Sequence, residues 1–260
     1  MLESALRYLG VYRLYEGGLR AQVEKDEIPG HIGIILDGNR RWAQEQGLSQ
    51  GLGHEQGANR AEELLDWGHE LGIKTVTLYV LSTENLDRTT DELRELFELI
   101  EARLNQLLND ARIVKYRVKV RAIGHLDLLP DSIVDLLKAI EAKTEGYNDH
   151  YLNIAVAYGG RAEITDVVRS VAQDVKSGKL SPEAISEDTV SARLYTAYLP
   201  NQEPDLIIRT SGEERMSGFL LWQGAYSELV FVDVYWPAFR FIDLLRAIRT
   251  YQKRRRRYGK

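Results

Sequence analysis

Two patterns of hydrophobic and polar positions alternate along the chain. Short runs rich in Ile, Val and Leu are typical of buried β-strands, and apolar residues three or four positions apart are typical of helices that cover a sheet. The strand pattern occurs at residues 32–36, 74–81, 117–123, 151–157, 205–209 and 229–232. The helix pattern occurs between them, at residues 54–71, 89–108, 131–145, 161–176 and 240–257. Because the two patterns alternate without a long Pro, Gly or Ser linker, the sequence predicts a single α/β domain with a mostly parallel six-stranded sheet flanked by helices.

A further helical pattern precedes the first strand. Residues 2–25 are amphipathic, with Leu6, Leu9 and Leu19 near one face. We expect residues 1–25 to form an N-terminal helical arm that packs on a main domain of residues 26–260. The segment is too charged for a signal peptide or a membrane span, so a cytoplasmic location is expected.

The composition narrows the classes of protein. The chain has 260 residues, 44% of them hydrophobic, and a formal net charge of −5. This length supports one large hydrophobic core, and the negative charge argues against nucleic acid as a partner. Cysteine is absent, which excludes disulfides, thiolate metal sites and cysteine nucleophiles and is compatible with a reducing cytoplasm.

The first strand pattern runs into a loop with an unusual set of polar groups. Asp37, Gly38, Asn39, Arg40 and Arg41 follow one another directly. A carboxylate is an oxygen ligand of the kind that Mg²⁺ takes, glycine allows close backbone approach, and guanidinium groups match phosphate oxygens. In open α/β sheets, ligands bind outside the carboxyl ends of the strands. The loop therefore predicts a site for a diphosphate with its metal, although Asp or Asn after a strand is also common in an ordinary turn or helix cap.

Three further strands end in polar loops. The second runs into residues 82–88, the fourth into residues 158–161 and the fifth into residues 209–218. Each loop alone is compatible with a solvated connection. Together with the first loop they would bring five arginines to one edge of the sheet, namely Arg40, Arg41, Arg88, Arg209 and Arg215. Unpaired guanidinium groups would repel one another there, so the sequence predicts an anionic ligand and a cation-binding carboxylate.

Competing catalytic motifs do not fit. The segment from Gly51 to Gly57 resembles a dinucleotide-binding loop, but its spacing is one residue too long and no strand precedes it. The sequence contains no Walker A, zincin or nucleophile-elbow pattern. The strand-end loops therefore remain the main indication of chemistry.

Taken together, these loops resemble the motifs of the cis-prenyltransferases, the isoprenyl diphosphate synthases that include undecaprenyl diphosphate synthase. The residues that carry the resemblance are 37–42, 82–88, 158–161, 209–217, 219–223 and Glu228, in the family's order. Residues 13–16 and 236–240 resemble most closely the actinobacterial branch, which contains short-chain Z-farnesyl and decaprenyl synthases. The resemblance implies a Mg²⁺-dependent transferase that condenses isopentenyl diphosphate with an allylic diphosphate (geranyl, farnesyl or longer) and forms a Z double bond.

The resemblance also implies a role for each site residue. Asp37 would be the indispensable catalytic acid and hold Mg²⁺, with Glu228 as the second metal-side carboxylate. Asn85 lies where the family is assigned its proton acceptor; since a neutral amide is a poor base, we expect it to orient the substrate. The other residues would bind the two diphosphates and complete the pocket: Gly38, Asn39, Arg40, Arg41 and His54 for the allylic diphosphate, Arg209, Arg215 and Ser217 for isopentenyl diphosphate, and Trp42, Gln50, Ser82, Thr83, Glu84, Leu86, Arg88 and Met216 around them.

Some positions depart from the family's pattern. Gln50 stands where many members have an arginine, Leu86 replaces a common tryptophan, and Glu214 stands where some members have a metal-side histidine. Val80 occupies a strand position where alanine is common, and a larger side chain there indicates a shorter product. An apolar tunnel for the growing chain would be lined by Leu93, Leu96, Phe97, Ile100 and Leu104, a stripe that is equally compatible with ordinary core.

Two other functions share these motifs. A non-catalytic partner subunit of the family would be expected to lack the acid and the arginine loop, whereas a phosphohydrolase would use the same metal and arginines on water. The resemblance further implies a homodimer. The basic run 253–257 is compatible with a solvated helix end, stabilised by the helix dipole, and with a peripheral contact with an anionic membrane.

Overall fold

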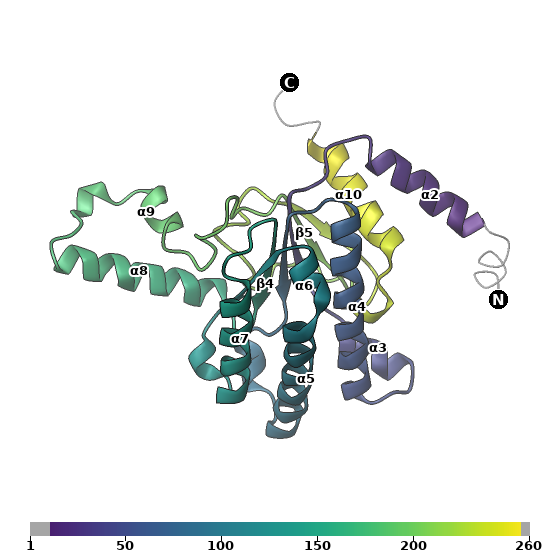
Figure 1. Ribbon diagram of the computed structural model, residues 1–260, viewed down its shortest axis with the longest axis horizontal. Coiled ribbons are helices and arrows are strands. Elements are labelled where there is room, and N and C mark those ends of the chain that lie inside the picture. The colour runs from purple at the N-terminus through teal and green to yellow at the C-terminus, as the bar shows by residue number, and fades with distance from the viewer. Residues whose placement is uncertain (1–10, 256–260) are drawn as a thin grey trace.

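The computed structural model describes residues 11–255 and shows a parallel sheet covered by helices (Figure 1). All six predicted strands are present: β1 (His31–Ile35), β2 (Thr75–Tyr79), β3 (Val118–Ile123), β4 (His150–Ala155), β5 (Leu206–Arg209) and β6 (Glu228–Phe231). Their order in the sheet is β3-β4-β2-β1-β5-β6, and each neighbouring pair is parallel. The predicted α/β class is confirmed, and the sheet is parallel throughout.

Strand β1 lies inside the sheet, between β2 and β5. Strands β2, β3 and β4, which follow β1 in the sequence, lie on one side of it in the sheet. Strands β5 and β6, which come later, lie on its other side. This reversal is a topological switch point, where open α/β sheets leave a crevice at the carboxyl ends of the strands. The fold therefore places the loop that begins at Asp37, after β1, beside the loop that follows Arg209, at the end of β5.

The strands beside the switch point are buried on both faces. Every residue of β1, β2 and β5 is buried, which explains why these segments are nearly continuous apolar runs in the sequence. Gly33, in the middle of β1, leaves room for an aromatic ring. A Cβ at this position would lie 2.9 Å from Cε1 of Phe219. The ring thus packs directly on the strand.

Helices cover both faces of the sheet and supply the walls of its crevice. They are α2 (Val11–Val23), α3 (Asn39–Glu45), α4 (Gln50–Glu70), α5 (Thr90–Asn109), α6 (Ala111–Lys115), α7 (Asp131–Thr144), α8 (Gly160–Lys176), α9 (Glu187–Ser191) and α10 (Phe241–Arg255). In Figure 1, α4, α5 and α7 run alongside one another on the body, whereas α8 and α9 project away from it.

Local hydrogen bonds fix where the helices near the crevice begin. Helix α4 starts at Gln50, earlier than predicted, because the Ser49 hydroxyl caps its first turn. Thr89 and Glu92 have the sequence spacing of a capping box, but the Thr89 side chain makes no cap bond at the start of α5. A capping box forms instead between Ser82 and Asn85, in the short 3₁₀ helix that follows β2.

Helix α2 packs against the closing helix α10. Its residues Leu19 and Val23 are buried, and Gln252 Nε2 donates a hydrogen bond to the Val23 carbonyl oxygen at 2.9 Å. Arg249 and Asp26 form an ion pair at 2.9 Å in the same region. Residues 1–10 of the predicted arm lie outside the described residues, and the division into an arm of residues 1–25 and a domain of residues 26–260 stays a prediction.

Candidate active site

An open polar pocket of about 1270 Å³ lies at the carboxyl edge of the sheet. The loops that follow β1, β2, β4 and β5 supply its walls, as the strand order requires. The arginines predicted to converge all line this pocket, and Arg161 joins them. The structure thus brings together strand ends that are far apart in the sequence.

Asp37 is held in this pocket by two guanidinium groups. Arg209 Nη2 donates to one carboxylate oxygen at 2.8 Å, and Arg41 Nη2 donates to the other at 3.1 Å. The Thr210 hydroxyl donates to the Asp37 carbonyl oxygen at 2.7 Å and fixes the backbone of this residue. Asp37 therefore ties the loop after β1 to the loop after β5.

Arg209 is the buried centre of this group, with a side chain that is only 5% exposed. Besides Asp37 it donates to Ser217 Oγ at 2.7 Å and to the carbonyl oxygen of Arg215. Its Nε has no hydrogen-bond partner among the described residues. A buried unsatisfied donor costs free energy, so such groups are uncommon in folded proteins.

The surroundings keep Asp37 ionised. Burial would raise the pKa of its carboxyl group, but the hydrogen bond and charge of Arg209, with Ser211 and Arg41, outweigh burial and lower this pKa. Glu213 extends the network, because its Oε1 lies 3.1 Å from Arg41 Nη1. The carboxylates of the network thus partly neutralise the arginines, and the remaining positive charge is available for an anionic ligand.

Two further arginines and a histidine lie on the β2 side of the pocket. Arg40, Arg88 and His54 line it, and Glu92 lies 3.8 Å from Arg40 Nη1. Burial, Arg88 and Arg40 together lower the pKa of His54 to about 4. Burial and the neighbouring Arg40 also lower the pKa of Arg88. His54 is therefore neutral near pH 7 and offers a hydrogen bond without adding charge.

Asn85 has its amide oxygen engaged by the backbone. Asn85 Oδ1 accepts a hydrogen bond from the Ser82 backbone N–H at 3.1 Å, and the Ser82 hydroxyl accepts from the Asn85 N–H at 3.2 Å. The atom that would accept a proton already has a donor. This geometry supports an orienting role for Asn85, with its amide N–H groups as donors toward a ligand.

The loop after β5 contains strained backbone. Ser211 and Ser217 have φ angles of 78° and 47°, a region that residues with side chains rarely occupy. The loop after β4 packs directly on it, because the Gly160 N–H donates to the Gly218 carbonyl oxygen at 2.8 Å. A Cβ on Gly160 would lie 2.6 Å from that oxygen. Strain of this kind persists where surrounding contacts fix a functional geometry.

Most of the residues predicted from the sequence meet in this pocket. Those that line it are Asp37, Gly38, Asn39, Arg40, Arg41, Gln50, His54, Ser82, Thr83, Glu84, Asn85, Arg88, Arg209, Arg215 and Ser217. Trp42, Leu86 and Met216 do not line it. Leu86 and Met216 instead pack against the hydrophobic core, and Trp42 belongs to the first turn of α3. That these three residues take part in substrate binding stays a prediction.

Glu228 does not meet Asp37 within one chain. It begins β6 and pairs with Leu206, which in turn pairs with Ile32. Asp37 lies five positions beyond Ile32, roughly 16 Å further along a parallel strand. The Glu228 carboxylate instead lies 3.3 Å from Arg254. A metal site formed by Asp37 and Glu228 of the same chain is therefore wrong, because the parallel register places them at opposite edges of the sheet.

The pocket also contains residues that were not predicted as site residues. Arg161 and Glu213 lie in polar loops that the sequence does indicate, so their composition could have shown them. Tyr79 lies on β2 without such a signal. Its hydroxyl is 3.2 Å from the carbonyl oxygens of both Tyr158 and Ser217, and it joins the loops after β4 and β5.

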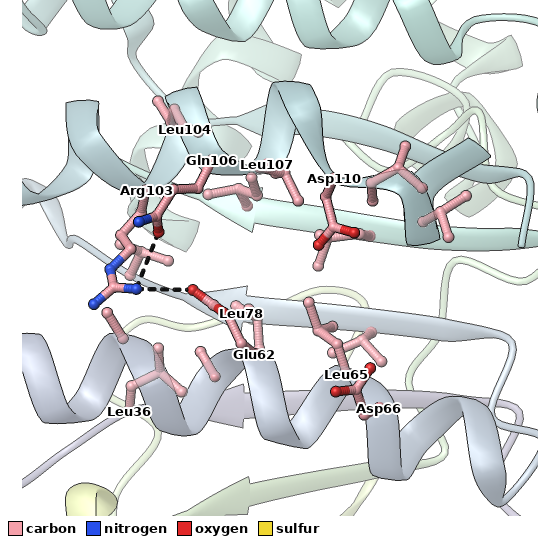
Figure 2. Close-up of a pocket in the computed structure, with 18 of the residues that line it drawn as sticks. Leu36, Glu62, Leu65, Asp66, Leu78, Arg103, Leu104, Gln106, Leu107 and Asp110 are labelled. Carbon is pink, nitrogen blue, oxygen red and sulfur yellow. Dashed lines mark hydrogen bonds and ion pairs between the residues drawn. The ribbon is translucent and has the colours of Figure 1, made fainter. Parts of the chain in front are cut away.

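A second, largely apolar cavity of about 390 Å³ lies between the sheet and helices α4 and α5 (Figure 2). It shares part of its wall with the polar pocket, namely Leu36, Asn39, His54, Val80 and Leu96. The two spaces are therefore neighbours, with a common wall through which an apolar chain attached to a polar head would pass.

The lining of this cavity agrees in part with the predicted tunnel. Leu96, Ile100 and Leu104 of α5 line it, whereas Leu93 and Phe97 do not. The lining residues follow one another at intervals of four, which places them on one face of the helix. Leu93 and Phe97 lie on a neighbouring stripe of α5 and are wrongly predicted as lining.

Aromatic rings gather at the other end of the cavity. His69 stacks on Tyr116 with ring centroids 3.7 Å apart, and His150 approaches His69 edge-on at 5.1 Å. All three line the cavity. His150 begins β4, so this end lies at the amino edge of the sheet, opposite the polar pocket.

Comparison with known sequences decides the family. The sequence profile of the undecaprenyl diphosphate synthase family matches residues 35–259, most of the chain. The chain belongs to this family of cis-prenyltransferases. It is therefore a transferase that elongates prenyl diphosphates with Z geometry.

Other members of the family are similar over nearly the whole chain. A tritrans,polycis-undecaprenyl-diphosphate synthase (geranylgeranyl-diphosphate specific) from Methanopyrus kandleri is 54% identical, over 96% of this chain and 92% of the relative. A protein of the same name from Methanocaldococcus jannaschii is 49% identical, over 96% of this chain and 90% of that relative. Both sources are archaeal, and the resemblance to the actinobacterial branch stays a prediction.

Solved structures of this family share the fold. Lavandulyl diphosphate synthase from Lavandula x intermedia, in complex with dimethylallyl diphosphate, has a TM-score of 0.83 and 33% identity, over 86% of this chain and 95% of that one. A probable undecaprenyl diphosphate synthase from Campylobacter jejuni has a TM-score of 0.71 and 30% identity, over 90% of this chain and 100% of that one. Among the described residues, no helix is long and apolar enough to cross a membrane.

Proposed function

We propose that this cis-prenyltransferase uses Mg²⁺ and adds isopentenyl diphosphate to geranylgeranyl diphosphate, with a long Z-polyprenyl diphosphate as product. The observation that carries the proposal is the common wall of the two cavities, at His54 and Val80. On one side lie arginines around Asp37, which suit a diphosphate head. On the other side lies an apolar space, which suits the tail.

The relatives support geranylgeranyl diphosphate over geranyl or farnesyl diphosphate as the primer. The two archaeal relatives carry this specificity in their names and share about half of their residues with the chain. Val80 argues against a long product, since a side chain larger than alanine at the cavity entrance favours a shorter one. We give more weight to similarity over the whole chain than to one side chain.

The residues present fit a Mg²⁺ ion that is shared with substrate. Among the described residues, no three His, Cys, Asp or Glu side chains form a cluster that could hold a metal. Mg²⁺ is commonly bound by one or two carboxylates together with substrate phosphates and water. The ionised Asp37 carboxylate, beside arginines that attract diphosphate, offers such a position. Bound there, the ion would neutralise charge on the departing diphosphate.

The arginines of the pocket supply the remaining charge stabilisation. When the allylic carbon loses diphosphate, an allylic cation remains and negative charge grows on the leaving group. In this proposal Arg40, Arg41 and Arg88 bind the allylic diphosphate and stabilise that charge where it develops. Arg209, Arg215 and Ser217 hold isopentenyl diphosphate alongside, so that its π bond attacks the cation and loss of a proton gives the Z double bond. Asn85 orients one of the diphosphates by donating hydrogen bonds.

A homodimer is part of the proposal. Helices α8 and α9 project from the body in Figure 1, and Val168 on α8 is 59% exposed. Ile185, which precedes α9, is also exposed. Exposed apolar side chains on a projecting element could be buried against a second copy of the chain. Sedimentation velocity of the wild-type protein and of a Val168→Asp variant tests this assignment, and a wild-type monomer at micromolar concentration would contradict it.

We also propose a cytoplasmic protein with a peripheral membrane contact. Lys253 and Arg254 of the basic run are exposed, and residues 256–257 lie outside the described residues. Each such charge near an anionic surface contributes about 1 kcal/mol. Deletion of residues 253–260 should weaken co-sedimentation with vesicles that contain anionic lipid. Unchanged binding would end the membrane proposal and favour a solvated helix end.

A radiolabel experiment separates condensation from hydrolysis. Isopentenyl diphosphate labelled on carbon is incubated with Mg²⁺ and each of geranyl, farnesyl and geranylgeranyl diphosphate. Label should enter a butanol-extractable lipid, most rapidly with geranylgeranyl diphosphate, and thin-layer analysis of the dephosphorylated product gives its length. Release of phosphate alone would identify a phosphohydrolase. No turnover of the pure chain, but turnover with a second subunit added, would identify a non-catalytic partner.

A further inference from the structure

Tyr79, the last residue of β2, is a buried part of the wall of the polar pocket. Its ring stacks on Phe219, with ring centroids 4.8 Å apart and planes 17° apart. Phe219 in turn packs on Gly33 of β1, and Tyr158 approaches the Tyr79 ring edge-on at 5.9 Å. The ring of Tyr79 is therefore fixed by packing, and its hydroxyl is held in one place.

The Tyr79 hydroxyl serves two loops of the pocket as a donor. It lies 3.2 Å from the carbonyl oxygen of Tyr158, in the loop after β4, and 3.2 Å from that of Ser217, in the loop after β5. The same two loops meet again nearby, where the Gly160 N–H donates to the Gly218 carbonyl oxygen at 2.8 Å. Burial raises the pKa of Tyr79, so the hydroxyl keeps its proton near pH 7 and remains a donor.

The two acceptors depend on Tyr79 to different degrees. The Tyr158 carbonyl oxygen also accepts from the Thr83 N–H at 3.0 Å. The Ser217 carbonyl oxygen has no second donor in the part of the chain that the structure describes. Ser217 is exposed, and its φ angle of 47° is one that residues with side chains rarely adopt. Because packing contributes little at this exposed position, the bond from Tyr79 is the main contact that holds the Ser217 backbone.

The backbone of Ser217 sets the direction of its side chain. Ser217 Oγ accepts a hydrogen bond from Arg209 Nη1 at 2.7 Å, and the same guanidinium group donates to the carbonyl oxygen of Arg215. These are the three residues that hold isopentenyl diphosphate in the proposed function. Without the Tyr79 hydroxyl, the Ser217 carbonyl group would turn toward water, and the Ser217 hydroxyl would move with it.

We infer that Tyr79 is a positioning residue for isopentenyl diphosphate, and this inference rests on the proposed function. Its hydroxyl holds the Ser217 carbonyl group and thereby directs the Ser217 side chain toward the diphosphate. Tyr79 acts through Ser217 and takes no part in the chemical step. Among the described residues, Arg40 and Arg88, which are assigned to the primer, share no hydrogen bond with Tyr79. The primer should therefore bind equally well without the hydroxyl.

The variant Tyr79→Phe removes the hydroxyl and keeps the ring that stacks on Phe219. Initial rates are measured with labelled isopentenyl diphosphate and geranylgeranyl diphosphate, each varied while the other is saturating. The KM for isopentenyl diphosphate should rise at least about fivefold, as expected for the loss of one hydrogen bond. The kcat and the KM for geranylgeranyl diphosphate should stay within about twofold of the wild type. A general loss of structure would not raise one KM alone.

Two further variants show whether the effect passes through Ser217. In the Ser217→Ala background, Tyr79→Phe should add less than about twofold to this KM, because no hydroxyl remains to be directed. Tyr198→Phe removes a hydroxyl that donates to Asn153 outside the pocket, and both KM values should stay unchanged.

Three results would overturn the inference. They are an unchanged KM for isopentenyl diphosphate in Tyr79→Phe, a rise in the KM of both substrates, and full additivity of Tyr79→Phe with Ser217→Ala. No condensation by the wild-type protein would instead refute the proposed function itself.

Discussion

Asp37 is subject to two opposing effects. Burial disfavours its charge, while Arg209 and Arg41 each donate a hydrogen bond to a different carboxylate oxygen. The effect of the guanidinium groups is the larger one and lowers the pKa of the carboxyl group. The carboxylate is therefore ionised and fixed in orientation before any ligand binds. A diphosphate that attracts these arginines would at the same time release carboxylate oxygens for Mg²⁺. Binding of the metal and of the substrate should therefore depend on one another.

The variant Asp37→Asn tests whether this charge is needed. Asn keeps the size of the side chain but removes the negative charge, so a cation at the reacting diphosphate loses its protein ligand. We expect kcat/KM to fall at least ~10²-fold, comparable with the loss of one electrostatic contact in other active sites. The measurement is incorporation of labelled isopentenyl diphosphate. Asp174→Asn removes an ion-paired acid on α8, and its activity should stay near wild type. Near-normal activity of Asp37→Asn would reject the assigned role.

Val80 is the residue that we expect to influence product length. It lines both the polar pocket and the apolar cavity, so a tail that reached from one into the other would pass it. Val80→Ala widens this passage and should shift the products toward longer chains. Val80→Trp narrows it, and a tail forced past an oversized ring costs roughly 1–3 kcal/mol, as overpacking does in a core. Thin-layer chromatography of the products measures their chain length. Identical lengths from the wild type and both variants would contradict this role of Val80.

At the scale of elements, the sequence predicts the alternation of strands and helices better than the contacts between them. Short runs rich in Ile, Val and Leu revealed all six strands, most clearly the fully buried β1 and β5. The polar loops were predictable because the carboxyl ends of parallel strands must share one edge. The position of Glu228 was not predictable, because it depends on the register between β6 and β5. Ion pairs between helices, such as Glu62–Arg103 and Asp66–Arg112, were not predictable either, because they depend on tertiary packing, which leaves no periodic signal in the sequence.

Strand β1 carries a buried histidine that should make stability depend on pH. His31 is 1% exposed, its Nε2 lies 2.8 Å from Thr77 Oγ1, and burial lowers its pKa to about 4. Between pH 6.5 and pH 4 the unfolded chain binds a proton that the folded protein excludes. The folded state should therefore lose up to ~3 kcal/mol as the pH falls through this window, and its stability should be complete above it.

The variant His31→Asn isolates this contribution from other groups that titrate in the same window. Its side chain cannot ionise and still offers an amide toward Thr77. Urea unfolding at a series of pH values should give a smaller loss of stability on acidification than for the wild type. Other histidines with lowered pKa, such as His54, affect both proteins equally and cancel in the difference. Parallel curves for the two proteins would show that His31 is not the source.

At the scale of the whole molecule, charge is separated between the site and the rest of the surface. The chain has a net charge of −5, yet Arg40, Arg41, Arg88, Arg161 and Arg215 line one pocket together with the buried Arg209. Their mutual repulsion is only partly offset by Asp37 and Glu213. This repulsion should therefore cost the folded protein stability, which a bound diphosphate would restore.

Inorganic diphosphate with Mg²⁺ should therefore stabilise the folded protein. A ligand that binds only the folded state at one hundred times its Kd contributes about 2.7 kcal/mol, so the unfolding midpoint should rise with its concentration. Sodium chloride of matched ionic strength should give no such rise and should weaken the effect of diphosphate by screening. Arg215, whose side chain is 61% exposed, can be replaced by Gln without disturbing the core, and Arg215→Gln should need more diphosphate for the same shift. If salt alone reproduces the shift, the arginines are only a charged surface and do not surround a diphosphate.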